Sequence, residues 1–199
     1  MRVITLPKSD EDAATLIFDA TWDALVQGDT ARLEELASQS TFPNGTDSWL
    51  GSHWLSTAVE AGNPTSLAWA LSKRPEINYV DNCGFTALYM ALRHEVSLEL
   101  ASADATALTI TLLDSLLDAG AEINLSSPIE GTVLHSAAWF SSPTVVRHLL
   151  ARDADPFVAS DDYISKTPAD VAKFHKRWEV HALLRAAMGQ TPSGLPRGG

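Results

Sequence analysis

Histidine and cysteine are the side chains of this sequence best suited to ligate a metal or to act as nucleophiles. The chain has six histidines and a single cysteine, at His53, His94, His135, His148, His175, His181 and Cys83. No two histidines stand at the spacing typical of metal ligands, and one thiolate cannot build a structural zinc site. We therefore expect no metal site, and we interpret Cys83 as a passive residue in preference to a redox thiol.

Adjacent carboxylates are a second possible source of chemistry, as an acid–base pair or a cation site. Asp161 and Asp162 form such a pair, but Asp162 is better explained as the residue that starts a turn. Glu34 and Glu35 are interpreted as ordinary solvated positions on a helix. The sequence contains no Gly-x-Ser-x-Gly elbow, phosphate-binding loop or dinucleotide fingerprint. Because no reactive groups converge, we predict a protein that is not an enzyme and binds no cofactor.

Composition and charge limit the classes of partner. Hydrophobic residues make up 45% of the 199 residues and charged residues 20%, as in globular domains. The formal net charge is −11, and no Lys or Arg occurs between Arg93 and Arg147. The last third instead contains a basic cluster of Lys166, Lys173, Lys176, Arg177 and Arg185. An acidic surface disfavours nucleic acid and anionic membranes and favours a basic partner, although acidity also serves solubility alone.

The expected location is the cytoplasm. The first eighteen residues contain charged side chains that interrupt any signal-like apolar stretch, so we expect no secretory signal. No apolar stretch is long enough to span a membrane. A single cysteine cannot form an internal disulfide and fits a reducing compartment.

An internal repeat indicates which elements position these residues. Segments that begin at Thr86, Thr132 and Thr167 each have an Ala five residues after the Thr, and His53 begins a fourth copy. Such spacing is typical of one face of a helix. Successive copies are 33, 46 and 35 residues apart. Since a repeat of this kind has about 33 residues, the third unit contains about 13 additional residues, around 93–111.

The repeated segments resemble the ankyrin repeat. Second halves rich in paired leucines follow the helical segments, at 116–124 and 149–156. The family pattern is Asp-x-x-Gly-x-Thr-Pro-Leu-His-x-Ala-Ala, then Val-Val, Leu-Leu and Gly-Ala-Asp; residues 132–155 match it best. The resemblance covers about residues 15–187. It implies an all-α ankyrin-repeat solenoid of about five helix-pair units, with an insertion in the third unit.

The repeat also predicts the boundaries. One domain is expected at 1–190, with units at 15–46, 47–80, 81–126, 127–161 and 162–188, and a flexible tail at 191–199. The first helix pair is expected at 18–38, broken at Gly28-Asp29. Gly84 is expected to adopt a positive φ in a turn. Glu130 and Ser165 replace that glycine in two later units, where the turn must differ.

The resemblance further implies where a partner binds. In ankyrin arrays, some contacts come from positions that flank the turn glycine, and Gly131 is one such flanking position here. Others come from the positions seven and eight residues after the Thr. With the acidic insert as a rim, the candidate residues are Trp49, Glu60, Asn82, Phe85, Arg93, His94, Glu95, Glu99, Ile129, Trp139, Phe140, Tyr163, Phe174 and His175. Exposed aromatic residues are typical interface anchors, although divergent packing could bury some of them, Phe174 above all. His135 matches the histidine of the repeat and is assigned a structural role.

These observations predict a non-catalytic protein–protein binding module that is monomeric when free and binds one protein partner. The favoured interpretation is an inhibitor, an immunity protein or antitoxin, which occludes the active site of a basic enzyme or toxin. A scaffold or adaptor that tethers a regulatory or host protein is the alternative. Ankyrin folds serve many roles, so the choice between the two rests partly on analogy.

Overall fold

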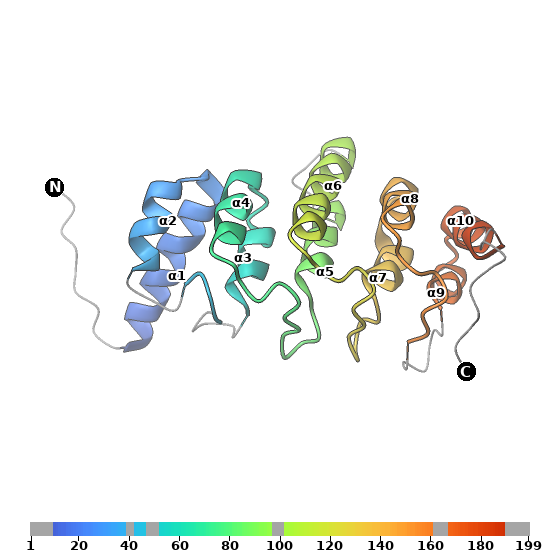
Figure 1. The fold of residues 1–199 in the computed structure, drawn as a ribbon, viewed down its shortest axis with the longest axis horizontal. Coiled ribbons are helices and arrows are strands. Elements are labelled where there is room, and N and C mark those ends of the chain that lie inside the picture. Colours follow the sequence, from blue (N-terminus) through green and yellow to red (C-terminus); the bar gives the residue numbers. More distant parts are fainter. Residues whose placement is uncertain (1–9, 39–41, 47–51, 97–101, 161–166, 190–199) are drawn as a thin grey trace. The chain divides into compact units, whose positions relative to one another are not determined.

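A computed structural model describes residues 10–38, 42–46, 52–96, 102–160 and 167–189. The regular elements in these ranges are helices, and extended segments pair only as isolated bridges, Thr46 with His53 and Ser127 with Gly131. The helices follow one another in pairs along the chain (Figure 1). The prediction of an all-α fold made of helix pairs is therefore confirmed.

The chain forms two compact units, which we describe separately. Unit 1 comprises residues 1–91 and 111–121, and unit 2 comprises residues 92–110 and 122–199. The division into a single domain with five repeat units remains a prediction.

Unit 1 begins with two helix pairs that pack on each other. The first pair is α1 (Asp10–Gln27) and α2 (Thr30–Ala37), and the second is α3 (Trp54–Glu60) and α4 (Pro64–Ser72). Gly28 ends α1 with a φ of 73°, and the Asp29 carboxylate caps α2 by accepting from the Arg32 amide at 3.0 Å. The break at these two residues confirms the prediction. Helix α1 begins at Asp10 and not near residue 18, where the sequence predicted its start. The segment from Asp10 to residue 18 contains Ala13 and Ala14, which have high helix propensity.

Hydrogen bonds connect the start of α4 to the end of α1. Asn63 caps α4, with its side-chain oxygen accepting from the Thr65 amide at 3.0 Å. The same side chain donates to the Val26 carbonyl at 3.0 Å, and the Ser66 hydroxyl donates to the Leu25 carbonyl at 2.6 Å. Two carbonyls at the C-terminal end of α1 thereby acquire partners from the neighbouring pair.

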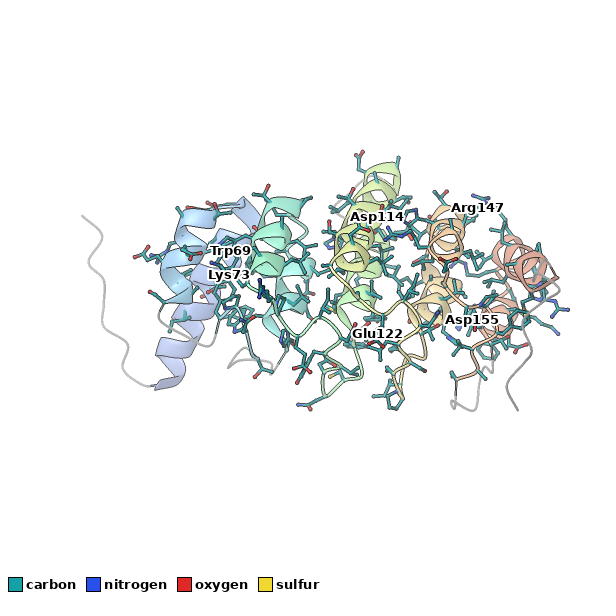
Figure 2. The ribbon with its side chains drawn as sticks, viewed as in Figure 1. Trp69, Lys73, Asp114, Glu122, Arg147 and Asp155 are labelled. Carbon is teal, nitrogen blue, oxygen red and sulfur yellow. The ribbon has the colours of Figure 1, made fainter. Side chains whose placement is uncertain are left out.

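The core of unit 1 is partly aromatic. Phe42 is 2% exposed and lies edge-on to Trp54, which is 3% exposed, with ring centroids 5.0 Å apart. Phe42 also stacks on Trp69 at 5.2 Å. Trp69 lies on α4 and Lys73 is the residue that caps its C-terminal end (Figure 2). The Trp69 indole and the Lys73 ammonium both donate to Glu34 on α2. These two donors lower the pKa of Glu34, Lys73 having the larger effect.

The predicted insertion is helical where the structure describes it. It follows α5 (Ala87–Leu92) and consists of the 3₁₀ helix η1 (Arg93–Val96) and the first turns of α6 (Ser102–Asp118). The insertion belongs to unit 2 up to residue 110, and the residues of α6 that follow belong to unit 1. An apolar stripe of Leu112, Leu113 and Leu116 on α6 is fully buried. The additional residues thus lengthen α6, the second helix of the pair that it forms with α5, at its N-terminal end.

Unit 2 contains two further helix pairs. The first is α7 (Val133–Phe140) with α8 (Pro143–Ala151), and the second is α9 (Pro168–Phe174) with α10 (Trp178–Gly189). Helix α7 packs on α8 and α9, and α10 packs on α8 and α9. The buried side chains include Leu134, Ala137, Val145, Leu149, Ala172 and Leu184. The alanines five residues after Thr132 and Thr167, Ala137 and Ala172, are both fully buried.

Glycines with positive φ form the turns that precede α5 and α7. Gly84 has a φ of 79°, which confirms the prediction. In the next copy the turn does differ, because Gly131, one residue later, takes the positive φ of 67°. A Cβ atom on Gly131 would lie 2.9 Å from the His135 ring. The interpretation of Gly131 as a contact position is wrong, since this residue is buried and needed by the backbone.

Candidate partner-binding surface

A buried cap holds the start of α7. The Thr132 amide donates to Nδ1 of His135 at 3.1 Å, and the Thr132 hydroxyl lies 2.8 Å from the same nitrogen. Both residues are buried, with 1% of Thr132 and 3% of His135 exposed. His135 thus has a structural role, as predicted, and its hydrogen bonds satisfy groups at the helix start.

Four rings from α7 and α9 meet at the C-terminal ends of these helices. Trp139 stacks on His175 with centroids 5.2 Å apart and an interplanar angle of 21°. Phe140 lies edge-on to Trp139 at 5.9 Å, and Phe174 lies edge-on to His175 at 5.1 Å. We call Trp139, Phe140, Phe174 and His175 the aromatic surface. Its rings come from segments more than thirty residues apart in sequence, so the packing of α7 against α9 brings them together.

The aromatic surface is open to solvent. Trp139 is 48% exposed and Phe174 is 61% exposed, while His175 is exposed and Phe140 is half-buried. The alternative that Phe174 is buried in the last unit is therefore wrong. Large exposed aromatic side chains that touch one another are uncommon on a free surface and are typical of binding sites.

Polar contacts brace the chain beneath this surface. The Arg177 guanidinium donates to the Ala137 carbonyl at 3.4 Å and to the Ser141 carbonyl, both at the end of α7. Burial lowers the pKa of Arg177, and the nearby Glu95 carboxylate acts in the opposite direction. Since the guanidinium stays charged in proteins, it is a permanent donor to these carbonyls. The turn that follows α9 is thereby attached to the turn that follows α7.

Glu95 binds the other side of the same turn. Its carboxylate accepts from the Ser142 amide at 2.9 Å and from the Thr106 hydroxyl at 2.6 Å. Glu95 was predicted as part of an acidic rim for a partner, but these two hydrogen bonds give it an internal role that the sequence analysis missed. The turn between α7 and α8 is thus held by a carboxylate from the insertion and by a guanidinium from the last helix pair.

The remaining predicted residues of unit 2 lie in the turn before α7 and in η1. Ile129 is 57% exposed in the turn between Ser127 and Gly131, and its amide donates to the Ser127 hydroxyl at 3.1 Å. Arg93 is exposed and His94 is half-buried, both in η1. Their roles in binding remain predictions.

Three predicted residues belong to unit 1. Glu60 is exposed at the end of α3, and Asn82 is exposed in the turn before α5. Phe85 is half-buried and stacks on Tyr89 with centroids 4.5 Å apart. Trp49, Glu99 and Tyr163 lie outside the described residues, as do Asp161, Asp162, Ser165 and the tail at 191–199.

Exposed residues next to the aromatic surface were not among the candidates. Lys173 and Lys176 are exposed on either side of Phe174 and His175 in sequence, and Trp178, at the start of α10, is 61% exposed. The signal that could have found them was the basic cluster in an otherwise acidic chain.

In the part of the chain that the structure describes, no three His, Cys, Asp or Glu side chains group closely enough to hold a metal ion. None of the described helices combines the length and the apolar character needed to cross a membrane. Cys83 is exposed and not part of a disulfide.

Comparison with protein-family models gives a match to part of the chain. Residues 55–103 match the family model described as ankyrin repeats (many copies). The matched segment runs from α3 through α5 into the first residues of α6. No curated protein sequence matches the chain.

Proposed function

We propose that this chain, of which residues 55–103 match the ankyrin-repeat family model, binds a protein partner through the aromatic surface of unit 2, since ankyrin repeats indicate protein–protein interaction. The observation that carries the proposal is the contiguous row of rings from Phe140 through Trp139 and His175 to Phe174. Two of its members are about half exposed or more. Rings of this size are the commonest anchors of protein interfaces, because they bury a large apolar area with little loss of side-chain freedom.

Rigid support favours this role. The cap of Thr132 and His135, together with the hydrogen bonds of Arg177, holds the helix ends that carry the rings. A surface that is ordered before binding loses less conformational entropy when a partner docks. The chain thus acts by presenting a shaped surface and not by catalysing a reaction.

We further propose that the bound partner is inhibited. In this proposal the chain is an immunity protein or antitoxin that covers the active site of an enzyme or toxin. The charge of unit 1 supports a basic target, since this unit has 14 Asp and Glu against 5 Lys and Arg. An acidic binder accelerates its encounter with a basic partner through electrostatic steering. A scaffold that tethers its partner without inhibiting it is the competing candidate.

The test is affinity capture from the source cell lysate with the full chain, with the double variant Trp139→Ala, Phe140→Ala as a matched bait. We expect one basic enzyme to be retained stoichiometrically by the wild type, weakly by the variant, and to be inactive while bound. A retained partner that keeps its activity would favour the scaffold. Equal retention by both baits would show that the aromatic surface is not the binding site.

The variant must remain folded for this test to be informative. We expect the thermal unfolding of the double variant to stay close to that of the wild type, because Trp139 lies half outside the packed core. A collapse of the unfolding transition would instead make these rings part of the core.

Affinity for the captured enzyme should also fall as salt is raised, and an affinity independent of salt would remove the steering argument.

A further inference from the structure

We propose that the aromatic surface accepts an acidic segment of the partner, in which carboxylates flank an apolar or aromatic side chain. This inference rests on the proposed function and specifies the chemistry of the segment that docks. The negative charge of this segment is opposite in sign to the positive charge that the net charge of −11 favours in a partner of the whole chain.

The first observation is the charge next to the rings. Lys173 and Lys176 directly precede and follow Phe174 and His175 in sequence, and both side chains are exposed. Lys176 directly follows His175, the residue that caps the C-terminal end of α9, and it adopts a φ of 59° there. Within the described residues, neither ammonium group has an ion pair or a side-chain hydrogen bond. Both are therefore available to a ligand.

The second observation is the state of the surrounding carboxylates. The Asp170 carboxylate accepts from the Thr167 amide at 3.1 Å and caps α9, and Glu179 pairs with Arg147 at 3.1 Å. Glu95 accepts from Ser142 and Thr106, as described above. The hydrogen bonds and the ion pair just described for these carboxylates are thus made with groups other than Lys173 and Lys176.

The third observation is the difference in charge between the two units. Unit 2 has 11 acidic and 9 basic residues, against 14 and 5 in unit 1. Residues 168–189, from the start of α9 to the end of α10, have 4 Lys and Arg but 2 Asp and Glu. The aromatic surface thus lies in the part of the chain that is richest in cations. A segment with apolar character for the rings and negative charge for Lys173 and Lys176 is complementary to it.

Such a segment would make the partner dipolar. Its basic region would account for attraction to the acidic unit 1, and its acidic segment would fix the orientation in which it docks on unit 2. Charge pairs at the edge of an interface contribute to specificity and orientation more than to affinity.

The test uses random peptides displayed on phage and selected on the immobilised full chain, after depletion on the variant Trp139→Ala. Depletion retains peptides that need the aromatic surface, and it removes basic peptides that adhere to the acidic chain without specificity. Enriched peptides are then synthesised, and their affinities are measured by fluorescence anisotropy for the wild type and three single variants, Lys173→Glu, Lys176→Glu and Arg185→Glu. Arg185 is the matched control, because it is an exposed cation on α10 outside the aromatic surface.

We expect the enriched peptides to combine Asp or Glu with aromatic or large aliphatic residues. Each lysine reversal should weaken their binding about 5-fold or more, the loss expected for an exposed charge pair, while Arg185→Glu should have little effect. Enriched peptides that are neutral or basic, or insensitive to both lysine variants, would overturn the inference and leave the proposed surface intact. Recovery of no peptide that depends on Trp139 would count against the surface itself, and so against both proposals.

Discussion

The two units use aromatic side chains in opposite ways. In unit 1, Phe42 and Trp54 are almost fully buried, and Phe42 also stacks on Trp69. In unit 2, Trp139, Phe174 and Trp178 are each about half exposed or more. Aromatic residues of one type thus stabilise the core of one unit and form a candidate binding surface on the other. The residue type alone does not distinguish these roles, since the difference lies in what packs on each ring.

The largest expected effect separates the two roles directly. We expect Trp54→Ala to lower the free energy of unfolding by about 3–5 kcal/mol, because it opens a large cavity among packed rings. Trp139→Ala should cost about 1 kcal/mol or less, since a half-exposed ring mainly loses its stacking on His175. Chemical denaturation followed by circular dichroism measures both. Similar losses for the two variants would contradict the distinction between core and surface rings.

A smaller effect is expected from the support beneath the aromatic surface. Replacing Arg177 with Met keeps much of the side-chain volume but leaves the carbonyls of Ala137 and Ser141 without this donor. We expect a loss of about 1–3 kcal/mol in stability, because the Ser141 carbonyl loses a charged donor. The Ala137 carbonyl still accepts from the Ser141 amide at 3.0 Å, so its loss is the smaller part. Arg185→Met is the matched control on α10 and should change stability little. If both substitutions have the same effect, Arg177 does not brace the turn.

Regular features of the chain could be predicted from the sequence. The spacing from Thr132 and Thr167 to the Ala five residues later identified α7 and α9, and Gly28-Asp29 marked the break between α1 and α2. These signals are local, because a cap or a turn depends on residues within one helical turn of each other. The aromatic residues of the candidate surface were also named, from the position of each ring within its repeat.

Features that depend on distant contacts could not be predicted. The stacking of Trp139 on His175 depends on how closely α7 approaches α9, which no local pattern encodes. Glu95 reads as one more acid of a charged insertion, yet it binds Ser142, 47 residues later. A carboxylate in an irregular segment has many possible partners, so sequence indicates its charge but not its contact. The same applies to Arg177.

The smallest expected effect concerns the start of a helix in each unit. In unit 2 a threonine stands at this position before α7, whereas in unit 1 His53 takes its place before α3 and accepts from the Leu55 amide through Nδ1 at 3.3 Å. The His53 ring is buried and lies 4.9 Å from the Tyr79 ring. Burial lowers the pKa of His53, and the charge of Glu76 opposes the shift. Only the neutral ring can accept at Nδ1, so protonation removes the cap.

The sign of the pH dependence follows from this lowered pKa. The unfolded chain binds a proton at His53 below about pH 6.5, while the folded chain resists it, so the stabilising contribution is complete above that pH and is lost as the pH falls below it. We expect the loss to approach the worth of one cap, about 1 kcal/mol. In His53→Asn, which keeps a capping oxygen that does not titrate, unfolding measured between neutral and mildly acidic pH should show a shallower decline than in the wild type. The other five histidines are common to both proteins and contribute equally to the two curves of stability against pH. Parallel curves would mean that His53 is protonated as readily in the folded chain as in the unfolded one. This cap would then be no more sensitive to acid than the threonine cap of α7.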